Sequence, residues 1–160
     1  MSFSKYQEYK QSGYEWIGQV PTHWEVKRLK NEALVIMGQS PSSDSYNEDG
    51  IGQPFLQGNA DFGLLNPTPR SYSTEVNKSA AEGDLLLSVR APVGALNIAN
   101  QAYGIGRGLC AIRPNEGLTQ KFLYYSLELI KLELFSIATG STYEAVTVER
   151  VSNSVCLVPP

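Results

Sequence analysis

The chain has few of the residues that build metal centres, disulfide frameworks or charge-driven nucleic-acid coats. Its 160 residues include one histidine and two cysteines, with 13 lysines and arginines in total and 16 aspartates and glutamates. The lone His23 leaves no basis for a histidine ligand cluster or a His-based catalytic triad. Cys110 and Cys156 lie in apolar runs, which predicts buried free thiols. The formal charge of −3 argues against a protein that coats nucleic acid by net charge alone.

Targeting and membrane signals are also lacking. The first ten residues contain no apolar signal core, and no run approaches the length of a membrane span. The composition, 42% hydrophobic and 18% charged, is typical of a soluble globular protein. We therefore expect a cytoplasmic protein with one domain over residues 1–160, because this length can bury one ordinary core.

Motifs for catalysis are incomplete wherever they begin. The glycines of Gly104-Ile-Gly-Arg-Gly108 lead into a strand-like run, whereas a phosphate-binding loop needs a helix after them. Asn66-Pro-Thr-Pro69 resembles the base-flipping loop of adenine methyltransferases, but Arg70 stands where an aromatic is needed. The carboxylates are scattered, without the close pattern of a two-metal nuclease. We expect no chemistry from this chain.

Hydrophobic periodicity predicts an α+β fold, mostly β, with many short strands and one long helix near the C-terminus. Turn-forming residues predict a loop over residues 39–52, a turn over 58–61 and irregular structure with a short strand over 64–84. Strands are expected over residues 24–29, 33–37, 53–57, 85–89, 95–99, 108–112 and 154–158.

The long helix is expected over residues 120–138, because its apolar residues recur at helical spacing. Thr119 is the expected N-cap, and Leu118 is placed to pack on Leu123 as a hydrophobic staple. Gly140 is expected to end the helix. A short helical turn is expected over residues 146–153.

Polar side chains suited to DNA contacts follow or precede several expected strands. Arg90 comes directly after the apolar run of residues 85–89 and before a rigid Ala-Pro-Val-Gly turn, so its backbone should be well fixed. Its forked guanidinium suits phosphate oxygens or a guanine edge, and glutamine or asparagine suits adenine. Ordinary loop chemistry is the alternative, with Arg90 paired to Asp84 or Glu82 as a brace. The candidate contacts are Arg90, Arg107, Gln39, Ser40, Ser42, Gln57, Asn59 and Thr142.

Segments along nearly the whole chain resemble the specificity subunit of type I restriction–modification enzymes. The opening run Tyr9-Lys-Gln-Ser-Gly-Tyr-Glu-Trp-Ile-Gly-Gln-Val-Pro-Thr-His-Trp-Glu-Val-Lys-Arg-Leu-Lys30 and the run Gly83-Asp-Leu-Leu-Leu-Ser-Val-Arg90 carry most of the resemblance. Gly38-Gln-Ser-Pro41 is similar to a loop of that family. Gly140-Ser-Thr142 and the final Val-Cys-Leu-Val-Pro-Pro160 complete the order.

The resemblance implies a target-recognition domain that binds one half of a bipartite site in double-stranded DNA. It implies two protein partners, the modification (methyltransferase) subunits and the restriction subunit. S-adenosylmethionine, ATP and Mg²⁺ would then belong to those partners, with no cofactor in this chain. In the family a long spacer helix follows the final prolines, whereas this chain stops at Pro160, so the resemblance implies the first, N-terminal recognition domain alone, without that helix.

Three alternatives remain open at this stage. The chain could be the recognition module of a fused restriction–methylation enzyme, which a catalytic motif block upstream would reveal. It could be a small enzyme, which turnover by the chain would reveal. It could also be a protein-interaction domain without DNA binding, a possibility that the acidic pI near 5.2 favours.

Overall fold

Two central β-sheets form the body of the protein. A computed structural model describes residues 5–138 and 146–160. The four-stranded sheet, in the order β10-β9-β12-β4, comprises β4 (Ala33–Met37), β9 (Leu85–Ser88), β10 (Leu96–Ile98) and β12 (Leu109–Pro114). The five-stranded sheet, in the order β5-β7-β6-β11-β8, comprises β5 (Tyr46–Asn47), β6 (Gln53–Leu56), β7 (Ser71–Ser73), β8 (Ser79–Ala80) and β11 (Tyr103–Ile105). Every pairing in these sheets is antiparallel except that of β11 with β6.

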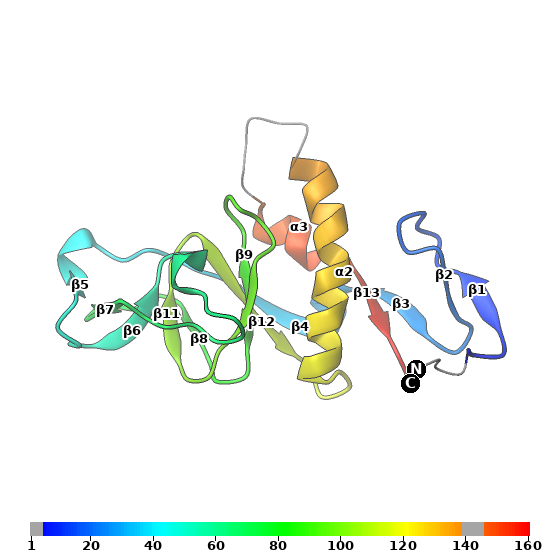
Figure 1. The fold of residues 1–160 in the computed structure, drawn as a ribbon, viewed down its shortest axis with the longest axis horizontal. Coiled ribbons are helices and arrows are strands. Elements are labelled where there is room, and N and C mark those ends of the chain that lie inside the picture. Colours follow the sequence, from blue (N-terminus) through cyan, green and yellow to red (C-terminus); the bar gives the residue numbers. More distant parts are fainter. Residues whose placement is uncertain (1–4, 139–145) are drawn as a thin grey trace.

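Smaller elements flank these sheets. Two further strand pairs join β1 (Tyr9–Gln11) to β2 (Gln19–Pro21) and β3 (Glu25–Arg28) to β13 (Val155–Val158). The helices are α1 (Leu29–Glu32), α2 (Gln120–Ala138) and α3 (Val148–Ser152), with 3₁₀ turns η1 (Ser43–Ser45) and η2 (Asn59–Asp61). Figure 1 shows the five-stranded sheet at one end of an elongated molecule, the β1–β2 hairpin at the other and α2 between them.

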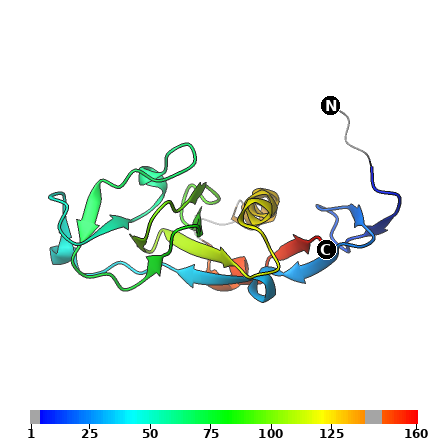
Figure 2. The same ribbon diagram turned by 90° about the horizontal axis from the view of Figure 1, so that it is seen from below.

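The hydrophobic core lies on both faces of the four-stranded sheet. Side chains alternate along β9, so Leu85 and Leu87 belong to one buried cluster and Leu86 belongs to a second. The first cluster includes Leu127 and other residues of α2, which Figure 2 shows end-on against the sheet. The second cluster includes Leu56 of the five-stranded sheet. This double burial explains why β9 is a continuous apolar run.

The long helix has the predicted bounds and N-cap. Thr119 Oγ1 accepts a hydrogen bond from the Phe122 N–H across 3.2 Å, which satisfies one of the free donors of the first turn. Leu118 and Leu123 are both buried in the same cluster, as a staple requires. Gly140, the expected helix end, lies outside the described residues.

Most of the predicted strands are confirmed, with shifts of one or two residues, and the α+β, mostly β class is confirmed. The strand predicted over residues 24–29 is wrong at its end, because Leu29 begins α1 instead. Strands β1, β2, β5 and β11 were not predicted. They have only two or three residues each, which is too short for a period-2 pattern to appear. Within the described residues, no helix is both long and apolar enough to cross a membrane.

Both cysteines are free and buried, as predicted. Burial raises the pKa of the Cys110 thiol to about 12 and that of Cys156 to about 11, because desolvation disfavours each thiolate. Neither thiol lies at the protein surface, and the two cysteine side chains act as small apolar groups of the core.

The raised pKa of Cys110 predicts a loss of stability in alkali. Above the ordinary thiol pKa the unfolded chain releases a proton that the folded chain keeps, so the free energy of unfolding falls as pH rises towards about 12. The loss from this group between about pH 8 and pH 10 is about 1.4 kcal/mol. Urea unfolding of the wild type and of Cys110→Ala at both pH values isolates this contribution. Equal pH dependence in the two proteins would contradict it.

Candidate nucleic-acid interface

The turn formed by Gly106, Arg107 and Gly108 lies where five strands end or begin. It connects β11 to β12, and backbone hydrogen bonds join it to two other segments, those that follow β6 and β9. Gly106 N–H donates to the Leu56 carbonyl across 2.8 Å, and Gly108 N–H donates to the Gln57 carbonyl across 3.2 Å. The Gly108 carbonyl accepts from Val89 N–H across 3.0 Å. The residues that follow β6 and β9 therefore meet at this turn.

The residues after β4 meet the same turn. Gln39 N–H donates to the Ile105 carbonyl across 3.0 Å, and the Arg107 N–H donates to Ser40 Oγ across 3.2 Å. In the antiparallel pairing of β9 with β12, Ser88 lies opposite Leu109, and Val89 N–H donates to the Gly108 carbonyl, so Arg90 directly follows the residue that contacts the turn. We call the group formed by Gln39, Ser40, Gln57, Arg90 and Arg107 the strand-end edge.

Two glycines allow this close approach. A Cβ on Gly38 would lie 1.9 Å from the Gly106 carbonyl oxygen, a distance no side chain can occupy. A Cβ on Gly106 would lie 2.7 Å from Gln57 Oε1 and 2.9 Å from its Cδ. Glycine at both positions is therefore required for the loop after β4 and the Gln57 side chain to pack against the turn.

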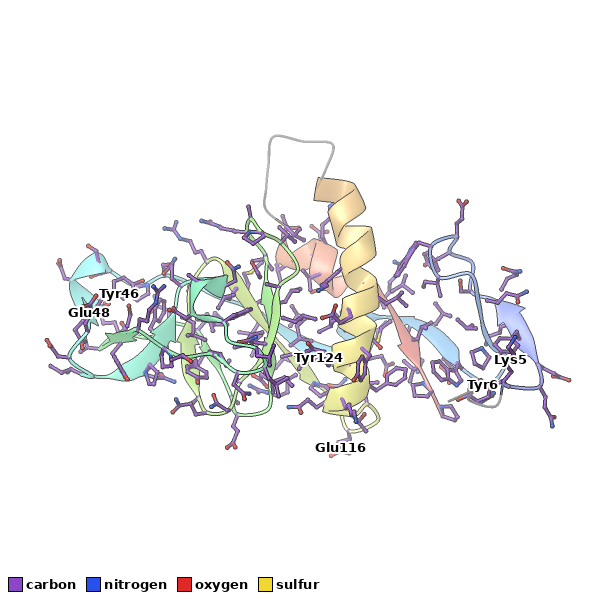
Figure 3. All side chains as sticks on the ribbon, in the orientation of Figure 1. Lys5, Tyr6, Tyr46, Glu48, Glu116 and Tyr124 are labelled. Atoms are coloured by element: carbon purple, nitrogen blue, oxygen red, sulfur yellow. The ribbon has the colours of Figure 1, made fainter. Side chains whose placement is uncertain are left out.

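A small hydrogen-bond network ties the side chains of the edge together. Gln57 Nε2 donates to Ser40 Oγ across 2.8 Å, and Ser40 Oγ also lies 3.2 Å from Gln57 Oε1. The Tyr46 hydroxyl donates to Gln57 Oε1 across 3.4 Å, and its ring packs on Phe55 with centroids 5.1 Å apart. Tyr46 was missed in the sequence, because nothing in the sequence brings β5 to the end of β6. Figure 3 shows Tyr46 beside Glu48 at the outer end of the five-stranded sheet.

The two arginines of the edge are exposed cations. Among the ion pairs of the described residues, none includes Arg90 or Arg107. Ser88 Oγ, itself buried, donates to the carbonyls of Arg90 (2.8 Å) and Pro92 (2.9 Å). The Ser88 side chain thus holds the backbone at Arg90, as the sequence analysis had predicted.

The alternative in which Arg90 pairs with Asp84 or Glu82 as a brace has no ion pair to support it among the described residues, and for Asp84 it is wrong. Asp84 is buried and accepts two 2.8 Å hydrogen bonds from the guanidinium of Arg113. This pair raises the pKa of Arg113 above its ordinary value, because hydrogen bonding and attraction to Asp84 favour the charged form. The sequence pattern missed this partner because Arg113 lies on β12, one register step from β9, and 29 residues away in the chain.

The remaining candidate contacts are placed less centrally. Ser42 is exposed before η1, where its carbonyl accepts from the backbone and side chain of Ser45. Asn59 is half-buried at the start of η2, one residue beyond Gly58, whose Cα lies 3.2 Å from a Cβ built on Gly108. Thr142 lies outside the described residues. The structure therefore brings five of the eight predicted residues together at the strand-end edge.

The strand-end edge thus groups two exposed arginines with amide and hydroxyl side chains at the ends of strands, and functional side chains are commonly carried by such loops on a rigid sheet. The family model for the type I restriction modification DNA specificity domain matches residues 21–160. The chain belongs to that family.

The relatives within the family agree. The provisionally named MjaX type I restriction enzyme specificity subunit of Methanocaldococcus jannaschii is 42% identical over 156 residues, which are 96% of this chain and 37% of that protein. The MjaIX specificity subunit of the same organism is 27% identical over 138 residues, 79% of this chain and 32% of that protein. The chain thus spans about a third of the length of these curated relatives.

Two solved structures have the same fold. The crystal structure of the HsdS subunit from Thermoanaerobacter tengcongensis superposes with a TM-score of 0.79 at 42% identity, covering 95% of this chain and 36% of that one. A chain from a structural study of complex assembly and conformational transition of the type I R-M system superposes with a TM-score of 0.82 at 43% identity, covering 95% of this chain and 37% of that chain.

Proposed function

We propose that this chain recognises one half of a bipartite sequence in double-stranded DNA, through the strand-end edge. The observation that carries the proposal is that separate segments of the chain deliver Gln39, Gln57, Arg90 and Arg107 to one turn, in a member of a DNA specificity family. Phosphate contacts from such an edge would set register, and contacts to base edges would set sequence. Ser42, Asn59 and Thr142 are proposed as flanking contacts.

The proposed role is non-catalytic and depends on partners. Methyl transfer would take place in modification subunits that bind S-adenosylmethionine, and translocation and cleavage in a restriction subunit that uses ATP and Mg²⁺. The two M. jannaschii relatives are named as type I restriction enzyme specificity subunits, which supports this division of roles. Mapping methylated adenines in the source genome with and without this gene tests the proposal. A methylated motif that disappears with the gene supports it, and an unchanged methylome would contradict it.

Weak binding by the chain alone is expected. One domain of net charge −3 makes few phosphate contacts, and Asp44, Glu48 and Asp49 are exposed near Tyr46. The dissociation constant for duplex DNA should therefore lie in the non-specific range, about 10⁻⁴–10⁻⁶ M at physiological salt. Fluorescence anisotropy with a labelled duplex measures it. Nanomolar, sequence-selective binding by the isolated chain would show this expectation to be wrong.

Arg90→Ala in the complete complex tests whether the arginine contacts DNA. A bidentate guanine contact should cost about 1–3 kcal/mol for the correct base and relax the choice at that position. A phosphate contact should instead weaken binding evenly across sequences and reduce the salt slope by about one unit. Binding titrations at several salt concentrations distinguish the two. Normal binding by a folded Arg90→Ala variant would remove Arg90 from the interface.

A further inference from the structure

Arg107 has an unusual setting within the strand-end edge. Arg107 is the one exposed residue in the stretch 103–112, and both of its glycine neighbours are buried. Three backbone hydrogen bonds fix the turn, two to the adjacent Leu56 and Gln57 and one to Val89. The exposed guanidinium of Arg107 is therefore carried by a turn whose backbone has little freedom to move.

A side-chain network at the surface of the protein contacts the backbone of Arg107. Ser40 Oγ accepts hydrogen bonds from the Arg107 N–H and from Gln57 Nε2. The Ser40 hydroxyl also donates to Gln57 Oε1 across 3.2 Å. A hydroxyl has one donor and two acceptor sites, so these three bonds use its full capacity. Because Ser40 lies close to both amide atoms of Gln57, it also occupies the donor–acceptor edge with which a glutamine would pair with adenine. Both side chains are thus engaged within the protein.

We propose that Arg107 is a specificity-determining residue that recognises a guanine in the major groove, and that Ser40, Gln57 and Tyr46 are positioning residues for it. This inference rests on the proposed function. The planar fork of arginine matches the O6 and N7 acceptors of guanine, and this match needs a fixed direction of approach. A phosphate contact needs only charge and reach, which a mobile side chain supplies equally well. The glycines on either side leave the turn without bulk beside the arginine.

The test is the base preference of the complete complex, measured on a library of duplexes that vary each position of the methylated motif. Arg107→Ala should reduce the preference for guanine at one position by about 5- to 150-fold. Arg107→Lys should lose the same preference while it retains binding to the phosphate backbone, because lysine keeps the charge but lacks the fork. If Arg107→Lys keeps the preference, or if Arg107→Ala weakens all sequences equally, the guanine assignment is overturned.

The positioning role has a separate readout. Ser40→Ala removes the hydroxyl that holds the Arg107 N–H, and it should reduce the preference at the same base position by about 2- to 12-fold. Ser43→Ala is the matched control, since this exposed serine has no hydrogen bond to the turn among the described residues, and it should leave the preference unchanged. A Ser40→Ala effect spread over all positions, or none, would overturn the positioning role. Altered preference in Arg90 or Gln39 variants with no change in Arg107 variants would overturn this inference alone, whereas no change in any of them would overturn the proposed function.

Discussion

Leu127→Ala should lower the free energy of unfolding by about 2–5 kcal/mol. Leu127 and Ile130 are each about 1% exposed and face the same cluster as β9 and β12, so truncation of either leaves a cavity between the helix and the sheet. Urea unfolding followed by circular dichroism measures the loss.

The exposed face of the same helix provides the control. Lys121→Ala removes a solvated side chain near the start of α2 and should change stability by less than about 0.5 kcal/mol. If Leu127→Ala and Ile130→Ala were equally mild, the inner face of α2 would not be packed on the sheet, and the proposed core would be wrong.

Arg113→Ala should cost about 3 kcal/mol, because it leaves the buried carboxylate of Asp84 without its partner. The estimate stays at the lower end of the range for buried pairs, since the Arg113 side chain is 43% exposed and water can replace part of the interaction. Asp84 also accepts the Ala81 N–H across 2.8 Å, so the carboxylate holds the turn that leads into β9.

A pair with a more exposed carboxylate serves as the comparison for Arg113, since the Glu128 side chain is 39% exposed and that of Asp84 is 2% exposed. Lys131→Ala removes the i,i+3 partner of Glu128 on α2 and should cost less than about 1 kcal/mol. Equal melting shifts for Arg113→Ala and Lys131→Ala would mean that the Asp84 pair is solvated and does not stabilise the base of β9.

Long periodic segments of this protein could be predicted from the sequence, and long-range partners could not. The helix α2 has the expected bounds, because its apolar spacing persists over several turns. The pairing of Asp84 with Arg113 depends on sheet register, which apolar runs buried on both faces do not specify. For the same reason Asp84 was considered as a partner of Arg90, although it pairs with Arg113.

In the candidate site, too, the residue types could be predicted from the sequence and their contacts could not. Glutamine, serine and arginine at strand ends could be chosen by chemistry alone, and the structure places five of them around one turn. Their mutual bonds could not be foreseen, because Ser40 and Gln57 belong to segments 17 residues apart that meet only when β4 and β6 both end at the turn. Tyr46 reaches Gln57 from a two-residue strand that no periodic pattern reveals.

The most direct test of the strand-end edge is photocrosslinking from single positions to DNA. A benzoylphenylalanine at Gln39, on the edge, is compared with one at Tyr125, which is 62% exposed on α2. In the complete complex with a duplex that carries the methylated motif, Gln39 should crosslink to the DNA and Tyr125 should not. Crosslinking from Tyr125 with none from Gln39 would place the DNA against α2 and contradict the strand-end edge as the recognition surface.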